Sequence, residues 1–267
     1  MTVDETPDEL GRRIRELTQE NARLAEMVAA RDGFLAVAAH ELLNPMTPIV
    51  GRLSLLRRAV ARGHLEPAKL DESLRELDWL VSLFVRRART LLDVSRITSG
   101  RLRLELVRVD LCDVARAVAG NFAAVAQQAG SSIGLDLPVR GVVVLGDRLS
   151  LEEILDNLVS NAIKYGGGKP IHIAASSDAQ NGTARLSVRD GGPGIPVDSQ
   201  ARIFERFERV VGPTDQTAGF GVGLWIVKQF TKAMNGTVEV ISTAEGSTFR
   251  ITLPTRPAKE CHGHRPA

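Results

Sequence analysis

Apolar residues recur at alternating steps of three and four along the first part of the chain, and this spacing restricts the fold more than any other feature. Such a repeat places one apolar stripe along a helix and is typical of a coiled coil. A polar residue, Asn21, lies within the repeat. An asparagine in a seam fixes the register and favours two strands, at a cost in stability. The members of this seam are Leu10, Ile14, Leu17, Asn21, Leu24 and Val28, and the register runs on to Leu35, Ala38 and Leu42.

A second seam of the same kind lies in residues 70–91 and predicts a second long helix. Between the two seams, residues 62–67 ("RGHLEP") are typical of a short helix–helix connection. Two long amphipathic helices in one chain cannot cover both of their apolar faces, but two copies packed as a four-helix bundle can. The alternative is an intramolecular hairpin packed against the rest of the chain. The members of the second seam are Leu70, Leu74, Leu77, Val81, Phe84, Ala88 and Leu91.

One histidine and two prolines lie inside the first helical stretch, at His40, Pro45 and Pro48. An interior proline removes a backbone hydrogen bond and costs roughly 3 kcal/mol or more. The apolar spacing resumes after the prolines, so we expect the helix to continue through a bend. His40 is about 200° round the helix from Leu42 and is therefore expected to face solvent, with Asn44 one turn away on the same face. Alone, such a histidine is more often a solvated side chain than a reactive one.

Composition and charge exclude several classes of protein. The 267 residues are 43% hydrophobic and 25% charged, as in ordinary globular proteins. A net charge of +2 gives no basic field for nucleic acid. Two cysteines make no disulfide framework and fit a reducing compartment. No run of about 18 apolar residues occurs, and the charged N-terminus does not resemble a secretory signal. We therefore expect a soluble cytoplasmic protein without a membrane span.

Four motifs follow one another in the second half of the chain, which carries most of the glycines. The first, residues 151–168 ("LEEILDNLVSNAIKYGGG"), predicts a helix with Asn157 and Asn161 one turn apart on its polar face. Asparagine carbonyls suit a Mg²⁺ ion that is mostly neutralised by phosphates, and Lys164 can add positive charge for those phosphates. If this motif stood alone, an amphipathic helix with a polar rim would be the preferred interpretation.

The second motif is a strand that runs into a glycine-rich turn, residues 186–196 ("LSVRDGGPGIP"). Asp190 at the strand end can accept a hydrogen bond from an exocyclic amine such as that of adenine. Gly192 and Gly194 lack a Cβ, so the backbone can approach a flat ligand closely. The alternative is a surface turn with an aspartate cap.

The third and fourth motifs predict a lid and a phosphate-binding loop. Residues 202–216 ("RIFERFERVVGPTDQ") place two phenylalanines before a polar run without periodicity, which is typical of a mobile lid. Residues 217–236 ("TAGFGVGLWIVKQFTKAMNG") place three alternate glycines before an apolar helix. A glycine-rich loop that opens a helix presents backbone N–H groups to phosphate. Each motif is weak alone, but their order behind a histidine-bearing coiled coil is a strong signal.

Together the motifs resemble those of two-component sensor histidine kinases, over roughly residues 34–254. "HELLNP" is similar to the phosphoacceptor H box of that family and "DNLVSNAIKY" to its N box. "DGGPGIP", "IFERFERV" and "GFGVGL" are similar to the G1, F and G2 boxes of the Bergerat ATP-binding fold. The resemblance implies an α+β chain in which a coiled coil and a helical hairpin, dimerised as a four-helix bundle, precede an α/β sandwich with a mixed sheet on one face and helices on the other. The implied domains are a coil at 1–33, a dimerisation and phosphotransfer domain at 34–98, an ATP-binding domain at 101–254 and a disordered tail at 255–267.

The resemblance also implies roles for individual residues. His40 is expected to be phosphorylated by ATP, Glu41 to orient the imidazole and accept its proton, and Asn44 to position water for hydrolysis of a phospho-aspartate. Asn161 is expected to hold Mg²⁺, with Asn157 in support. The other expected nucleotide contacts are Lys164 and Tyr165 with the phosphates, Asp190 with the adenine amine, Gly192 and Gly194 around that pocket, Arg209 with the γ-phosphate, and Gly219, Gly221 and Gly223 beside the phosphates.

The expected activity is transfer of a phosphoryl group from Mg-ATP to His40 and then to an aspartate of a response regulator receiver domain, with a phosphatase activity on the same partner. Expected partners are a second copy of the chain, the receiver domain and a separate sensor protein that binds the N-terminal coil. The chain departs from the family at Leu43, where Arg or Lys is usual, so the usual docking electrostatics around His40 do not carry over. Two other functions stay open: a pseudokinase or coiled-coil interaction module that only binds nucleotide, and a Bergerat-type ATPase of another pathway.

Overall fold

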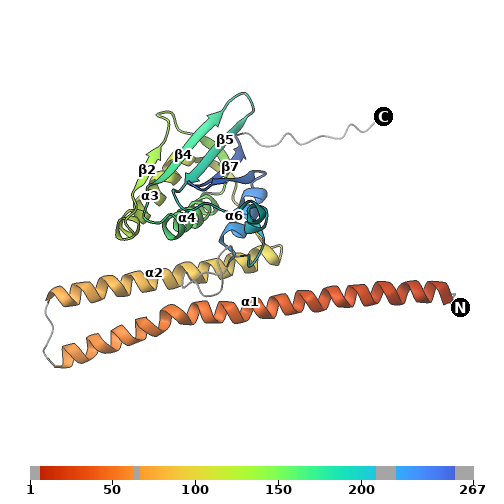
Figure 1. Ribbon diagram of the computed structural model, residues 1–267, viewed down its shortest axis with the longest axis horizontal. Coiled ribbons are helices and arrows are strands. Elements are labelled where there is room, and N and C mark those ends of the chain that lie inside the picture. Colours follow the sequence, from red (N-terminus) through yellow and green to blue (C-terminus); the bar gives the residue numbers. More distant parts are fainter. Residues whose placement is uncertain (1–6, 63–66, 209–220, 256–267) are drawn as a thin grey trace. The chain divides into compact units, whose positions relative to one another are not determined.

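The structure is a computed structural model of the chain and describes residues 7–62, 67–208 and 221–255 (Figure 1). The expected tail at 255–267 lies almost wholly outside the described residues. Contacts divide the chain into two compact units, residues 1–91 and 92–267. In the described part of the chain, no helix has both the length and the apolar character needed to cross a membrane.

Two long helices, α1 (Pro7–Ala61) and α2 (Pro67–Thr98), account for the helical unit, and α2 runs on into the second unit. Helix α1 continues without interruption through Pro45 and Pro48, so the prediction that the prolines do not end the helix is confirmed. Arg52 of α1 forms an ion pair with Glu76 of α2. This contact links the two helices of the hairpin.

The apolar stripe of the N-terminal coil is open to solvent in the single chain. Ile14 and Leu17 are each 57% exposed, and Leu24 and Val28 are each 48% exposed. A partner within the helical unit would have buried these side chains. The described residues of the helical unit therefore leave this stripe uncovered.

A five-stranded mixed sheet, with strand order β2-β4-β5-β7-β6, forms the centre of the second unit. Strand β2 pairs in parallel with β4, and the remaining pairs are antiparallel. A separate antiparallel pair, β1 and β3, lies outside this sheet. The strands are β1 (Val107–Asp110), β2 (Ile133–Asp136), β3 (Val143–Gly146), β4 (Ile171–Asp178), β5 (Thr183–Arg189), β6 (Thr237–Thr243) and β7 (Gly246–Pro254).

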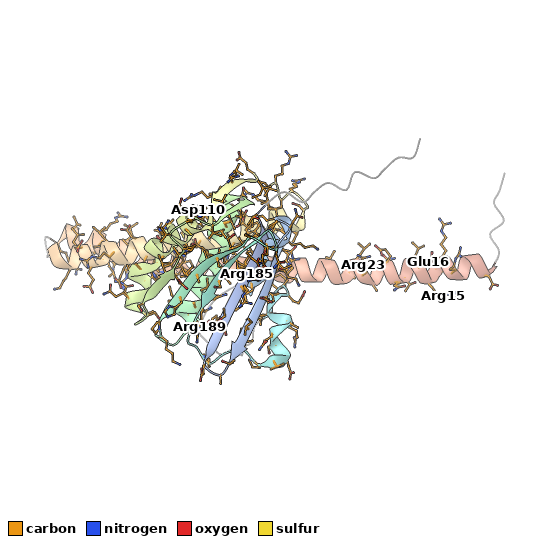
Figure 2. The ribbon with its side chains drawn as sticks, turned by 90° about the horizontal axis from the view of Figure 1, so that it is seen from above. Arg15, Glu16, Arg23, Asp110, Arg185 and Arg189 are labelled. Atoms are coloured by element: carbon orange, nitrogen blue, oxygen red, sulfur yellow. The ribbon has the colours of Figure 1, made fainter. Side chains whose placement is uncertain are left out.

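Helices of the second unit lie against one face of the sheet (Figure 1). Strand β5 shows why only one face is covered. Its alternate residues Ala184, Leu186 and Val188 are buried, whereas Arg185 and Arg189 point to the opposite, exposed face (Figure 2). This alternation confirms the predicted α/β sandwich, with a mixed sheet on one side and helices on the other. The helices are α3 (Leu111–Gln128), α4 (Arg148–Tyr165) and α6 (Gly223–Ala233), with the short α5 (Val197–Gln200) and a 3₁₀ turn, η1 (Arg202–Phe204).

Candidate nucleotide-binding site

Helix α4 carries the two asparagines singled out in the sequence, and Asp147 determines where it begins. The Asp147 carboxylate accepts hydrogen bonds from the backbone N–H groups of Ser150 at 2.8 Å and Glu105 at 2.9 Å. An N-terminal cap of this kind satisfies donors that the helix itself cannot pair. Burial opposes the charged form, but these hydrogen bonds outweigh it and lower the pKa of Asp147. One face of α4 is buried through Ile154, Leu155, Leu158, Val159 and Ala162.

The opposite face of α4 meets the start of α6. Asn157 and Asn161 are both half-buried on this face. The Asn157 side-chain amide donates to the backbone carbonyl of Glu153 at 2.8 Å. Its carbonyl oxygen is turned toward Gly223, where a Cβ would lie only 2.6 Å from it. The structure thus brings Asn157 of the first motif together with a glycine of the fourth.

Asp190 lies directly after β5 and is held in one position. It is 8% exposed. Its Oδ1 accepts hydrogen bonds from the N–H of Gly192 at 2.9 Å and of Ser247 at 3.3 Å. Its own N–H donates to the carbonyl of Ser247 at 2.9 Å. Oδ2 makes no hydrogen bond to a described residue, so it is the oxygen with which a ligand amine can pair.

The glycines of this turn are packed against the protein itself. A Cβ at Gly192 would lie 2.5 Å from the carbonyl oxygen of Tyr165, at the end of α4. A Cβ at Gly194, where φ is +79°, would lie 1.8 Å from the carbonyl oxygen of Thr243. The sequence interpretation assigned these glycines to close approach of a ligand. The structure adds that close backbone contacts within the chain already require them.

Lys164 and Tyr165 end helix α4 beside the Asp190 turn. The Lys164 Nζ lies 4.9 Å from the centre of the Tyr165 ring, within the range of a cation–π contact. Tyr165 remains 39% exposed. Gly166 follows and closes the helix with a hydrogen bond from its N–H to the carbonyl of Ala162. The end of α4 therefore carries a cation and a phenol.

An aromatic cluster anchors the chain before residue 209. The rings of Phe204 and Phe249 meet edge to face, with centroids 6.4 Å apart. The Arg206 guanidinium lies over the rings of Phe207 and Trp225, at 5.0 Å and 4.9 Å from their centres. Burial lowers the pKa of Arg206. These contacts join the third motif to β7 and α6.

Phe207 and Gly221 lie on either side of residues 209–220 and are hydrogen-bonded to each other. The Phe207 N–H donates to the carbonyl of Gly221 at 2.9 Å. Both residues have positive φ, 66° and 63°. The structure therefore brings Phe207 of the third motif and Gly221 of the fourth together.

Several predicted site residues cannot be placed beside this site. Arg209 and Gly219 lie outside the described residues. His40 and Glu41 lie on α1, but their side chains are outside the described part, so the predicted solvent-facing orientation of His40 stays a prediction. Asn44 is exposed on α1. All three belong to the helical unit, residues 1–91.

The sequence interpretation missed the residues that hold the Asp190 turn from the other side. Ser242 and Ser247 lie at the tip of the β6–β7 hairpin, about fifty residues further along the chain. Ser242 Oγ accepts from the N–H of Ile195, and Ser247 pairs with Asp190. The run "ISTAEGSTF" offers two serines and a turn, and nothing in its spacing points to Asp190.

Two protein families match the chain. Residues 30–100 match the His Kinase A (phospho-acceptor) domain, and residues 146–257 match the histidine kinase-, DNA gyrase B- and HSP90-like ATPase. Both matched ranges contain the motifs described above. The first lies over most of the helical hairpin and the second over the Asp190 turn and α4.

Curated relatives align along most of the chain. Sensor-like histidine kinase SenX3 of Mycolicibacterium smegmatis is 33% identical over 243 residues, which are 89% of this chain and 61% of that protein. Sensor histidine kinase TmoS of Ectopseudomonas mendocina is 32% identical over 245 residues, which are 90% of this chain and 24% of that protein. The chain thus spans only part of the length of the relatives it matches.

Solved structures agree with these matches. Acinetobacter baumannii histidine kinase AdeS superposes with a TM-score of 0.57 at 25% identity, over 81% of this chain and 98% of that one. Full-length ShkA in complex with AMPPNP superposes with a TM-score of 0.57 at 29% identity, over 83% of this chain and 46% of that one. With the phospho-acceptor and ATPase domains both matched, the chain belongs to the two-component sensor histidine kinases.

Proposed function

We propose that the chain is a protein-histidine kinase that transfers the γ-phosphoryl group of Mg-ATP to His40. The observation that carries the proposal is the Asp190 turn. One carboxylate oxygen is held by two backbone N–H groups and the other is left for a ligand amine, next to the polar face of α4. The adenine amine is the proposed partner of Asp190. The ShkA structure, with its bound ATP analogue AMPPNP, supports this proposal by its similarity.

The phosphates are proposed to lie between α4 and the start of α6. No side chain among the described residues caps the N-terminus of α6, whose first residue is Gly223. Unpaired backbone N–H groups at a helix start bind anionic phosphate, and Gly221 and Gly223 let the backbone come close. Gly219 and Arg209 are proposed to complete this part of the site.

The residues present fit Mg²⁺ as well as ATP. Asn161 is half-buried on the face of α4 that meets α6, and its uncharged oxygen suits a Mg²⁺ ion that retains several waters. Asn157 is proposed to support it, and Lys164 and Tyr165 to contact the phosphates. Bound Mg²⁺ would neutralise phosphate charge, which is the main requirement of phosphoryl transfer.

His40 is proposed to act as the nucleophile. The imidazole is largely neutral near pH 7 because its ordinary pKa is about 6.5. One ring nitrogen forms a bond to the γ-phosphorus, the bond from that phosphorus to the bridging oxygen breaks, and ADP leaves. Glu41 is proposed to orient the ring and accept its proton. The phosphoryl group then passes to an aspartate of a response regulator. Asn44 is proposed to assist the later hydrolysis of that phospho-aspartate.

A second copy of the chain is the proposed partner of the helical unit. The seam places Ile14, Asn21 and Val28 at one set of alternate positions and leucines at the other. β-Branched residues and one asparagine at one set of seam positions, with leucines at the other set, favour a two-stranded coiled coil. The exposure of this stripe in the single chain supports such pairing. The same coil is the proposed contact for a separate sensor protein.

Labelling tests the activity directly. The protein is incubated with γ-labelled ATP and Mg²⁺, and the label is expected to be acid-labile, base-stable and absent from His40→Gln. His172→Gln is a matched control, because His172 is an exposed histidine on β4 that pairs with Arg189 on the sheet face not covered by helices. This control is expected to keep the label. Label on serine or threonine would contradict the proposal.

One observation favours a second function, that of a pseudokinase that binds nucleotide without transferring phosphate. Leu43 is 64% exposed at the position where the family usually carries a cation, three residues from His40. A missing charge there weakens the docking of an anionic partner. Retained ADP binding without any label would favour this second function over the first.

A further inference from the structure

The tip of the β6–β7 hairpin, residues 242–247, is hydrogen-bonded to both ends of the Asp190 turn, residues 190–195. At the first end, the backbone of Ser247 exchanges two hydrogen bonds with Asp190, one with its N–H and one with its carboxylate. At the second end, the N–H of Ile195 donates to Ser242 Oγ at 2.7 Å. The backbone of Ser247 and the hydroxyl of Ser242 therefore hold a turn that lies about fifty residues earlier in the sequence.

The two ends are also joined to each other through hydroxyl groups. Ser242 Oγ lies 2.9 Å from Ser247 Oγ and 3.3 Å from the carbonyl oxygen of Gly246. Because Ser242 Oγ accepts the hydrogen bond from Ile195, its own hydrogen is available for one of these two acceptors. Ser247 is 4% exposed and Ser242 is half-buried, so the hydroxyl pair is partly shielded from water. One serine thus connects both ends of the turn.

The hairpin and the turn are in direct contact with no space between them. A Cβ at Gly194 would lie 1.8 Å from the carbonyl oxygen of Thr243 and 3.2 Å from Ser242 Oγ. A Cβ at Gly246 would lie 2.1 Å from the carbonyl oxygen of Asp190. Close-packed groups transmit small displacements to each other. A shift of the hairpin tip would therefore move the Asp190 carboxylate.

We propose that Ser242 is a positioning residue for nucleotide recognition, which holds the Asp190 carboxylate in place through Ile195 and Ser247. The inference rests on the proposed function, because it takes Asp190 as the acceptor of the adenine amine. Ser242 affects how tightly the base binds and which base is preferred. It does not act on the phosphoryl transfer step, since its hydrogen bonds to described residues are all with the turn and the hairpin.

The test compares Ser242→Ala with Ser242→Thr. Ser242→Ala leaves the Ile195 N–H without its acceptor, so the Kd for ADP and the KM for ATP are expected to rise about five- to twentyfold. The kcat of autophosphorylation is expected to stay within about twofold. Inosine lacks the exocyclic amine, so the preference for ATP over ITP reports the contact of this amine with Asp190. This preference is expected to fall in Ser242→Ala, because the Asp190 carboxylate is no longer held in place. Ser242→Thr keeps the hydroxyl, so its Kd for ADP, its KM for ATP and its preference for ATP over ITP are expected to equal those of the wild type.

Ser187→Ala is the matched control. Ser187 is half-buried in β5 of the same sheet, and its hydroxyl has no hydrogen-bond partner among the described residues. Its Kd and base preference are expected to equal those of the wild type. If Ser242→Ala lowers Tm and kcat while KM and the ATP/ITP preference stay unchanged, Ser242 only supports the fold and the inference is wrong.

Two further measurements separate this inference from the proposed function. If the wild type does not bind ADP, or if Asp190→Asn keeps the preference for ATP, the proposed function fails. If the wild type binds ADP and Asp190→Asn loses the preference for ATP, but Ser242→Ala binds like the wild type, only the positioning role fails. Should Ser242→Ala not fold, hydrogen exchange of the Ile195 amide in the wild type decides. Protection that increases with ADP supports the role, and exchange at an unprotected rate overturns it.

Discussion

Gly194 illustrates, at the scale of a residue, how the site depends on contacts within the protein. Its φ of +79° disfavours any residue with a Cβ, and the Thr243 carbonyl also occupies the space where that Cβ would lie. Gly182, in the turn after β4, has a similar φ of +63° but nothing within 4 Å of the same position. The two glycines therefore separate the cost of backbone conformation from the cost of steric overlap.

Alanine substitutions at these two glycines are expected to differ in cost. Gly182→Ala is expected to lower the free energy of unfolding by about 1–2 kcal/mol, the cost of a left-handed conformation. Gly194→Ala is expected to lose at least about 1–3 kcal/mol more, because the hairpin must shift to make space. Urea denaturation of both variants measures the difference. Equal losses would contradict the steric contact with Thr243.

Helix α4 is the element that presents the proposed Mg²⁺ contacts and two of the proposed phosphate contacts, and its first turn is fixed by one carboxylate. Asp147 accepts hydrogen bonds from the helix itself and from Glu105, which precedes β1. The cap therefore ties the start of α4 to a segment about forty residues earlier. The charged state of this carboxylate is part of the stability of the element.

Asp147→Asn is expected to change how stability depends on pH. Because the pKa of Asp147 is lowered in the folded state from its usual 3.8, its stabilising contribution is fully present above that value and is lost as the pH falls through the lower folded-state pKa. The difference in Tm between wild type and variant is expected to shrink below about pH 4. Thermal unfolding from pH 7 to pH 2.5 measures it, with Asp136→Asn, exposed on β2, as the control for loss of one carboxylate. A difference that is constant with pH would contradict the expectation.

At the scale of the whole molecule, the chain is divided into a helical unit and a nucleotide-binding unit. The helical unit exposes an apolar stripe that a second copy is proposed to cover. The nucleotide-binding unit buries its own core of aliphatic side chains between the sheet and the three helices. The stability of the first is therefore expected to depend on protein concentration, and that of the second on nucleotide.

Calorimetry is expected to resolve two transitions. ADP at a hundred times its Kd is expected to stabilise the nucleotide-binding unit by about 2.7 kcal/mol and to leave the helical unit unchanged. Dilution is expected to lower only the transition of the helical unit, because only a dimer responds to its own concentration. If ADP and dilution shift one shared transition, the two units unfold together and the expectation is wrong.

The sequence alone predicted those features that depend on short-range periodicity. The uninterrupted helix through Pro45 and Pro48, the helix that carries Asn157, and the strand that ends before Asp190 were all readable from residues a few positions apart. Periodic burial is local, so one sequence is sufficient to indicate it. The ordered motifs extended that interpretation to the α/β sandwich and the family.

Only the tertiary structure decided which remote residues meet at Asp190. The N–H groups of Ile195 and Ser247 reach partners 47 and 57 positions away, across a hairpin that no local pattern assigns to this turn. The glycines at 192 and 194 were attributed to a ligand, yet carbonyls of Tyr165 and Thr243 also require them. Contacts of this kind depend on how the strands order themselves in the sheet. That order follows from the packing of the whole domain and leaves no periodic trace in the sequence.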